Sequence, residues 1–281
     1  MALYKPTELR EFLDGLGIHP KKSLSQNFLI DGNIIRRTIA SAEVVAGDIV
    51  VEIGPGPGAL TEALLACGAK VVAVEKDDTY AAALGRLDPT GENLRVIHGD
   101  ALEVDIIEPL RALGKGDQKV KLIANLPYHL TTPLLARFIK MNSLFSGLYV
   151  MVQEEVGRRM TAVAGGEDYS SLTVFLDFYS TPKYCFFVGR KCFFPSPKVD
   201  SAVVALLLHP PVLEEESVSN FFILTRTAFE HRRKMLRSSL KGLYPPERTM
   251  AVLEEIGKDP QLRPEQLSLD EFVALYQGLN R

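Results

Sequence analysis

The tetrad Asn125-Leu126-Pro127-Tyr128 follows KVKLIA, a run of strand-forming residues at 119–124. An amide, a carbonyl held in place by proline and an aromatic ring together suit the binding of a flat polar ring. The amine of a nucleobase is a poor nucleophile because its lone pair is delocalised into the ring. The Asn125 side-chain oxygen and the Leu126 carbonyl are interpreted as acceptors for the two amine hydrogens, which localises that lone pair in the transition state. The tetrad therefore predicts a site for alkylating a base amine.

Aromatic residues near this site are interpreted as stacking partners for the base. Tyr128 is one candidate, and Phe193 or Phe194 in Phe193-Phe194-Pro195-Ser196-Pro197 is another. The alternative, in which these rings only pack in the core, stays open for each of them. His129 follows the tetrad, but nothing in the sequence supplies it with an acidic partner, so it is treated as a bystander.

A glycine-rich turn predicts the cofactor end of the site. EIGPGPG, residues 52–58, follows an apolar run and precedes the helical pattern ALTEALLACG. Glycines such as Gly54 and Gly56 let the backbone approach a ligand closely, and a helix N-terminus adds N–H donors. Two alternatives stay open: a plain strand-to-helix turn, and the dinucleotide fingerprint that Gly54-x-Gly56-x-x-Ala59 also satisfies.

Two carboxylates end the next two predicted strands. Glu75 is placed to accept hydrogen bonds from ribose hydroxyls, which fits a nicotinamide dinucleotide and S-adenosylmethionine equally well. Asp100 is placed to accept from the amine of an adenine, or alternatively to cap the segment that follows. Because parallel strands end at one edge of a sheet, these residues predict a common crevice for a cofactor that contains adenosine.

The elements that must position these residues are seven β-rich runs between residues 49 and 208: IVVEIG, KVVAVEKD, LRVIHGDAL, KVKLIANLPY, GLYVMVQEEV, LTVFLDFYS and VDSAVVALLL. Helical patterns between them predict an α/β domain with a largely parallel sheet. The last two runs, joined by TPKYCFFVGRKCFFPSPK, predict an antiparallel hairpin. After residue 210 the periodicity becomes helical, so we expect an α/β domain at 1–210 and a helical domain at 211–281.

Composition excludes several classes of protein. The 281 residues are 46% hydrophobic and 24% charged, and the apolar run at 202–208 is too short to span a membrane. The N-terminus lacks the pattern of a signal peptide, so a cytoplasmic protein is expected. Cys67, Cys185 and Cys192 have no metal-ligand spacing, and no metal is expected.

The net charge of −3 hides a basic segment. From Arg226 to Lys241 there are six basic residues and one acidic residue, which gives this predicted helix a net charge of +5. Such a surface suits contacts with RNA phosphates, although a helix face that contacts only water is the alternative. The residues predicted to bind RNA are Arg232, Arg233, Lys234 and Arg237.

Together the motifs resemble the rRNA adenine N6,N6-dimethyltransferases, in the bacterial small-subunit branch of that family. The resemblance runs from about residue 20 to residue 281 and rests on KKSLSQNFL, EIGPGPGALT, VEKD, GDAL, NLPY, FFPSPKVDSAV and AFEHRRKMLRSSL, in the family's order. The sequence departs from the family pattern at Glu167-Asp168 and at His231, which puts in doubt only how that surface meets rRNA.

The resemblance implies a class I S-adenosylmethionine-dependent methyltransferase fold, with a seven-stranded sheet and a helical C-terminal domain. It implies that Asn27 and Leu29 contact the methionine part of the cofactor. Gly54 and Gly56 would then approach its carboxyl and ribose region, and Glu75 would hold the ribose.

Further roles are implied for residues at the ends of later strands. Asp100 and Ala101 would read the adenine of the cofactor, and Asn125 would lie between the sulfonium and the target amine. Tyr128 and Phe193 correspond to the family's base-stacking aromatics.

The implied reaction is dimethylation of two adjacent adenines near the 3′ end of 16S rRNA in the immature 30S subunit. Three alternatives are kept: an Erm-like enzyme acting on 23S rRNA, a small-subunit assembly factor whose binding role dominates, and a nicotinamide-dependent dehydrogenase. A monomer is expected, because nothing in the sequence demands an oligomer.

Overall fold

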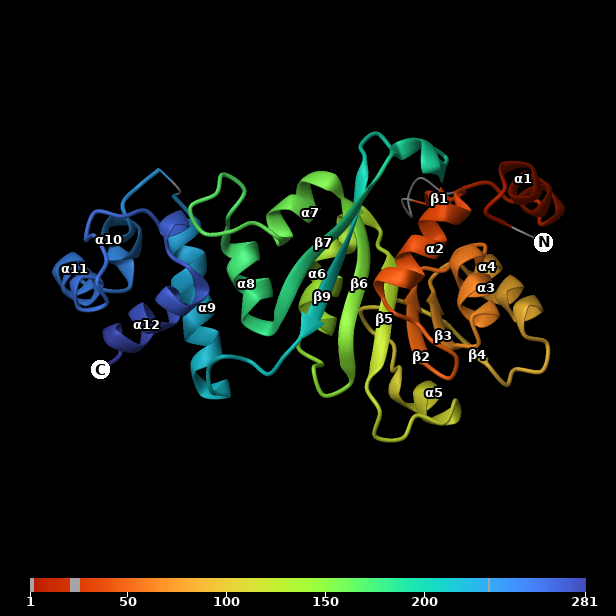
Figure 1. The fold of residues 1–281 in the computed structure, drawn as a ribbon, viewed down its shortest axis with the longest axis horizontal. Coiled ribbons are helices and arrows are strands. Elements are labelled where there is room, and N and C mark those ends of the chain that lie inside the picture. The colour runs from red at the N-terminus through yellow and green to blue at the C-terminus, as the bar shows by residue number, and fades with distance from the viewer. Residues whose placement is uncertain (1–2, 21–25, 232) are drawn as a thin grey trace. The chain divides into compact units, whose positions relative to one another are not determined.

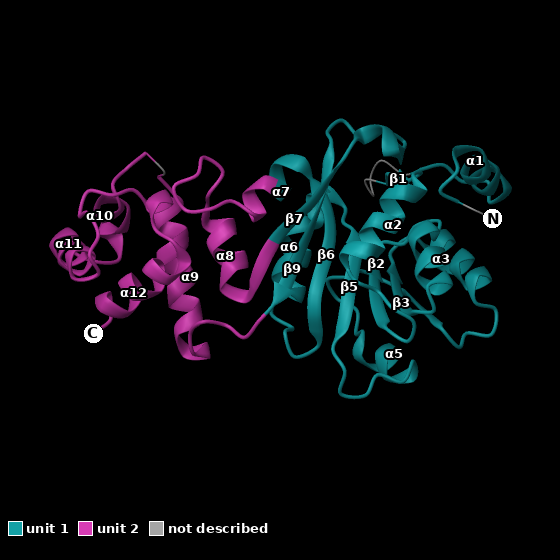
Figure 2. Cartoon of the chain, in the orientation of Figure 1, with its two compact units in different colours: residues 1–157, 183–208 teal, residues 158–182, 209–281 magenta. Residues whose placement is uncertain are grey.

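The computed structural model describes residues 3–20, 26–231 and 233–281, and divides the chain into two compact units (Figure 2). The first unit comprises Met1–Gly157 and Lys183–Leu208, and the second comprises Arg158–Pro182 and His209–Arg281. The prediction divides the chain once, after residue 210, whereas the structure groups 158–182 with the C-terminal helices. That residue 210 separates a catalytic domain from an RNA-binding domain stays a prediction.

A seven-stranded sheet forms the centre of the first unit, in the order β4-β3-β2-β5-β6-β9-β7 (Figure 1). The strands β2 to β6 are parallel where they pair, and β9 is antiparallel to β6. Their bounds are Ile49–Ile53 (β2), Lys70–Glu75 (β3), Leu94–His98 (β4), Val120–Asn125 (β5), Phe145–Gln153 (β6), Ser180–Val188 (β7) and Ser201–Leu208 (β9). The α/β prediction is confirmed.

The position of β2 determines where a ligand can bind. The chain continues outward from β2 through β3 to β4 and then returns to place β5 on the other side of β2. At such a reversal the connections diverge and leave a crevice at the carboxyl ends of the strands. β2 is completely buried, as expected for a parallel strand covered on both faces, although its fourth residue is Glu52.

Helices and a small second sheet surround this centre. β1 (Phe28–Leu29) pairs antiparallel with β8 (Phe193–Phe194). The remaining helices that lie within the first unit are α1 (Pro6–Gly15), α2 (Gly32–Ser41), α3 (Ala59–Ala66), α4 (Asp78–Leu84), α5 (Ile107–Ala112) and α6 (Thr131–Phe138). α7 (Glu154–Met160) runs across the boundary between the units.

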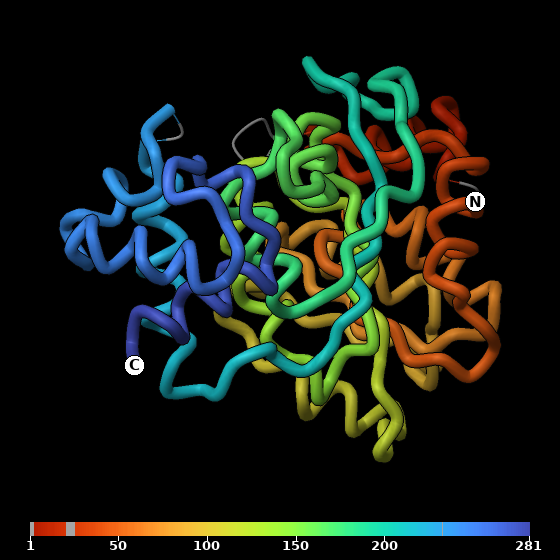
Figure 3. Tube along the Cα trace, turned by 60° about the vertical axis from the view of Figure 1, so that its left-hand side comes forward, coloured from red at the N-terminus to blue at the C-terminus, as the bar shows by residue number. Residues whose placement is uncertain are grey.

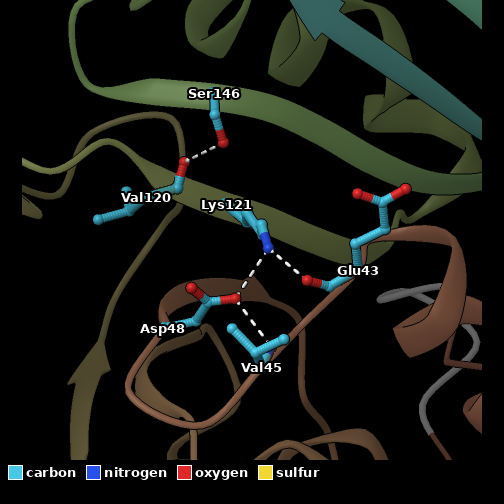
Figure 4. Close-up of polar contacts among 6 residues, drawn as sticks. All are labelled: Glu43, Val45, Asp48, Val120, Lys121 and Ser146. Atoms are coloured by element: carbon cyan, nitrogen blue, oxygen red, sulfur yellow. Dashed lines mark hydrogen bonds and ion pairs between the residues drawn. The ribbon is translucent and has the colours of Figure 1, made fainter.

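A polar network ties the start of β2 to β5 (Figure 4). The Lys121 Nζ donates to Asp48 Oδ2 at 2.8 Å and to the Glu43 carbonyl at 2.7 Å. The same Asp48 oxygen accepts from the Val45 N–H at 2.9 Å. These bonds hold the loop before β2 against β5, a neighbouring strand that comes much later in the sequence.

The second unit is helical, with α8 (Ser171–Tyr179), α9 (Glu215–Phe229), α10 (Leu236–Ser239), α11 (Pro246–Glu255) and α12 (Leu269–Leu279). The helices expected in PPERTMAVLEEIGKD and SLDEFVALYQGL are confirmed as α11 and α12. Aromatic rings fill the contact between α8 and α9; Phe178 lies 5.3 Å from Phe221 and 4.9 Å from Phe222 between ring centroids.

The prediction of a strand at LTVFLDFYS is wrong, because all of this run except its last residue lies in α8, and the sheet strand β7 begins only at Ser180. Ser170 and Thr173 form a capping box that starts the helix. Phe175, Phe178 and Tyr179, at helical spacing, all contact the ring of Phe222. Packing on α9 therefore outweighs the strand propensity of this β-branched and aromatic run.

The single basic helix predicted between Arg226 and Lys241 is also wrong. α9 ends at Phe229 and α10 begins at Leu236. The Leu236 N–H donates to the Leu262 carbonyl at 2.9 Å, so the backbone there pairs with a distant turn and not with the preceding helical turn.

Candidate functional site

A cavity of about 240 Å³ lies in the first unit at the carboxyl ends of β2, β3 and β5. Its walls include the predicted cofactor residues and the tetrad: Asn27, Leu29, Gly54, Gly56, Glu75, Asp100, Ala101, Asn125, Leu126, Pro127 and Tyr128. Residues separated by as much as a hundred positions therefore meet at one place.

The glycine-rich loop needs its glycines for shape. Gly54 and Gly56 have φ values of +69° and +54°, in the left-handed region that side chains rarely adopt. At Gly56 a Cβ atom would also lie 2.9 Å from the ring of Phe28. The loop can therefore follow this path, close to the cavity, only without side chains at these positions.

Glu75 holds this loop in place. One carboxylate oxygen accepts from the Gly56 N–H at 2.8 Å, and the other accepts from the Asp77 N–H, also at 2.8 Å. Burial raises the pKa of Glu75, and these two N–H donors act against that shift. Each oxygen retains a further lone pair, so the carboxylate can still accept from ligand hydroxyls.

Asp100 performs two tasks at the end of β4. Its Oδ1 accepts from the Leu102 N–H at 2.9 Å, which caps the turn after the strand. Its Oδ2 pairs with the Lys76 ammonium at 2.7 Å, and that ion pair holds the pKa of Asp100 below its ordinary value. The geometry allows Asp100 both to cap this turn and to accept a hydrogen bond from a ligand.

The amide of Asn125 has a defined orientation. Its Nδ2 donates to the Asn27 carbonyl at 3.1 Å, which leaves Oδ1 as the acceptor on a side chain that lines the cavity. The next residue is held by a bond from the Leu126 N–H to the Met151 carbonyl at 3.1 Å. Among the described residues, no backbone N–H outside the regular helices and strands donates to the Leu126 carbonyl. Two acceptors, one from each residue, are therefore available at the end of β5.

Tyr128 is tethered at its hydroxyl, which lies 2.7 Å from the Oγ of the buried Ser201. Burial raises the pKa of this phenol. Phe193 lies elsewhere: only 3% exposed, it packs against Ile34, Met151 and other apolar side chains and does not line the cavity. This position agrees with the alternative interpretation of the sequence, in which the ring of Phe193 only packs in the core.

Sequence reasoning missed Glu52. It lines the cavity, is 2% exposed and accepts a hydrogen bond from the Thr61 hydroxyl at 2.6 Å. Desolvation raises its pKa from 4.5 to about 8, and the nearby negative charge of Glu75 adds to the shift. The signal that was overlooked is an acid within an apolar strand run. His129, interpreted as a bystander, also lines the cavity, as do Leu3 and Leu9.

In the second unit, Arg233 and Lys234 are exposed and border a hollow with Lys241, Gln261 and Arg263. Arg237 is less accessible, because its guanidinium contacts the sulfurs of Met235 and Met250. Arg232 lies outside the described residues. Over the part of the chain that the structure describes, no group of three or more acidic, His or Cys side chains is placed to hold a metal, and no helix is long and apolar enough to cross a membrane.

Comparisons with known proteins show the family of the chain. Residues 18–280 match the family model described as ribosomal RNA adenine dimethylase. The chain is 56% identical over 280 residues to the ribosomal RNA small subunit methyltransferase A of Protochlamydia amoebophila, covering 99% of this chain and 98% of the relative. It is 45% identical to the protein of the same name from Chlamydia felis, over 98% of this chain and 95% of the relative.

Solved structures show the same fold. A dimethyladenosine transferase from Plasmodium falciparum aligns with a TM-score of 0.74 and 27% identity, over 90% of this chain and 97% of that one. The 23S rRNA methyltransferase ErmE aligns with a TM-score of 0.70 and 25% identity, over 91% and 100%. The predicted class I methyltransferase fold is thereby confirmed. With a matching family model over nearly its whole length, the chain belongs to the ribosomal RNA adenine dimethylase family.

Proposed function

We propose that the protein uses S-adenosylmethionine to dimethylate the N6 amines of two adjacent adenines near the 3′ end of 16S rRNA, in the immature 30S subunit. The observation that carries this proposal is the oriented amide of Asn125, whose Oδ1 is left as an acceptor on a side chain that lines the same cavity as Leu126, Glu75 and Asp100. We also propose that the protein is cytoplasmic and monomeric and that it acts during ribosome assembly.

The residues of the cavity fit S-adenosylmethionine by their chemistry. Glu75 offers buried acceptors for ribose hydroxyls, and Asp100 offers an ionised acceptor for the amine of an adenine. The backbone at Gly54 and Gly56 would approach the methionine part, with Asn27 and Leu29 on the same wall. When bound, the cofactor supplies an electrophilic methyl group on a sulfonium.

The chain itself must make the adenine amine nucleophilic and aim it. Asn125 Oδ1 and the Leu126 carbonyl would accept its two hydrogens and favour the pyramidal nitrogen of the transition state. Pro127, with φ −57° and ψ 122°, fixes the direction of the preceding peptide. Tyr128, held by Ser201, would stack on the base. Positioning supplies most of the acceleration, and the proton that the alkylated amine loses can pass to water.

The second unit would bind rRNA phosphates. Arg233 and Lys234 are exposed and border a basic hollow, which supports this assignment. Arg232, which lies outside the described residues, is proposed to bind RNA from the sequence alone. Arg237 is assigned less directly, because its guanidinium contacts methionine sulfurs. Phe193 stays a proposed stacking residue, and this role requires that substrate binding moves its ring out of the core.

The proposal is tested by transfer of radiolabelled methyl groups from S-adenosylmethionine to 30S subunits that lack this modification, followed by mapping of the labelled nucleotides. Dimethyladenosine at two adjacent positions near the 3′ end of 16S rRNA is the expected result. Label on protein-free 23S rRNA in its place would refute the 16S assignment and support an Erm-like enzyme, to which the structural likeness to ErmE also points.

A second experiment separates the enzyme from an assembly factor. A Glu75→Ala protein should lose cofactor binding, because Glu75 supplies both the ribose acceptor and the anchor of the glycine loop. If that variant still bound 30S and supported normal subunit maturation, the binding role would dominate.

A further inference from the structure

The N-terminal helix α1 packs on the first unit through one face. Leu9 and Leu13 are 1% and 3% exposed and form a buried cluster with Phe28 and Tyr80. The remaining face, including Arg10 and Glu11, is exposed. Figures 1 and 3 both show this N-terminal stretch, in red, against the body of the unit. α1 is therefore a docked helix with a defined apolar face.

This apolar face reaches the cavity. Leu9 and, just before the helix, Leu3 both line it, and each is 1% exposed. Phe28 continues the contact, because its ring packs edge-on against Tyr80 at 5.3 Å and lies over Gly56 of the glycine loop. A continuous set of apolar contacts thus joins α1 to the loop that approaches the cofactor.

Further contacts tie the same helix to the glycine loop and to β8. The Arg86 guanidinium lies 4.3 Å from the centroid of the Phe12 ring and donates to the Pro57 carbonyl at 2.5 Å. Arg10 lies 5.3 Å from the centroid of the Phe194 ring. Because one guanidinium contacts both α1 and the glycine loop, a displacement of the helix would be felt at the loop.

We infer that α1, which precedes the region matched by the family model, completes the cofactor site: Leu3 and Leu9 close the cavity over bound S-adenosylmethionine and slow its release. The inference rests on the proposed function for the identity of the cofactor. Apolar side chains at this wall would shield the bound molecule from water on that side, and displacing them would be one step in its release. α1 is thus assigned a binding role that its position outside the family model does not suggest.

The test compares two variants of one helix in the full-length protein. Leu9→Ala removes a cavity-lining side chain, whereas Leu16→Ala changes a residue that is 37% exposed at the end of the same helix. We expect Leu9→Ala to raise the dissociation constant of S-adenosylmethionine roughly tenfold, mainly through faster release, and Leu16→Ala to change it less than about twofold. Calorimetry and stopped-flow fluorescence measure the two quantities.

The unaltered protein provides a second measurement that does not depend on a variant folding. Hydrogen exchange in residues 6–15 should slow roughly tenfold when S-adenosylmethionine is added, while exchange in α12 should not change. The inference would be overturned if Leu9→Ala and the unaltered protein released S-adenosylmethionine at the same rate, or if hydrogen exchange in α1 did not change when the cofactor was added. Either result would leave the proposed function intact. Failure of the unaltered protein to bind S-adenosylmethionine would overturn both.

Discussion

Replacing Glu52 by glutamine is expected to stabilise the protein at alkaline pH and to have little effect in acid. Glu52 lies in the middle of the sheet, is 2% exposed, and receives a hydrogen bond from the Thr61 hydroxyl. The charged group that contributes to its shift is Glu75, which is also an acid. An ionised Glu52 is therefore poorly compensated, whereas a glutamine oxygen can accept from Thr61 without carrying a charge.

The size and sign of the effect follow from the pKa. Burial raises the pKa of Glu52 from 4.5 to about 8, so between these values the folded protein holds a proton that the unfolded chain has lost. The stability associated with the neutral side chain is complete below about pH 4.5 and is lost as the pH rises through about 8. The full shift corresponds to about 5 kcal/mol in the free energy of unfolding, at about 1.4 kcal/mol per pH unit.

Urea denaturation of both proteins without cofactor measures this difference. The advantage of Glu52→Gln should be under about 1 kcal/mol near pH 5 and several kcal/mol near pH 8.5. Titrating groups that do not interact with Glu52 are common to both proteins and cancel in the comparison. Glu92→Gln, at an exposed position, is the control and should stay within about 0.5 kcal/mol throughout. A difference for Glu52→Gln that did not vary with pH would refute the reasoning.

Three further predictions concern the site and the RNA surface. Asn125→Ala should lower methyl transfer roughly a hundredfold or more while cofactor affinity stays within a few-fold, because the lost acceptor acts on the target amine; normal single-turnover rates would contradict this role. Lys76→Met should weaken cofactor affinity roughly two- to fivefold, because the ammonium holds the carboxylate of Asp100 in place, and titration at low and high salt should show the effect shrinking with salt. Replacing Arg233 and Lys234 together by alanine should reduce the salt dependence of 30S binding by about one unit of slope for each lost phosphate contact, and an unchanged slope would exclude this surface.

Much of the candidate site could be predicted because its residues lie at the ends of consecutive parallel strands. Sequence order and sheet topology then bring Gly54, Glu75 and Asn125 to one edge without further information. Glu52 was missed because its neighbours read as an ordinary buried strand, and only the tertiary structure shows that an acid there lines the cavity. Phe193 could not be placed because a phenylalanine suits a stacking site and a core equally well.

The sequence alone determined the class of fold, the family and many, but not all, of the residues around the cavity, since these depend on local periodicity and on motifs in a fixed order. Tertiary structure decided the rest. Packing of Phe175 and Phe178 against α9 turned a strand-like run into a helix, and a bond from Leu236 to Leu262 divided the basic segment. The Asn27 carbonyl, about a hundred residues earlier in the sequence, orients the Asn125 amide, and burial raises the pKa of Glu52. Such effects arise from contacts between residues distant in the chain, which no local pattern encodes.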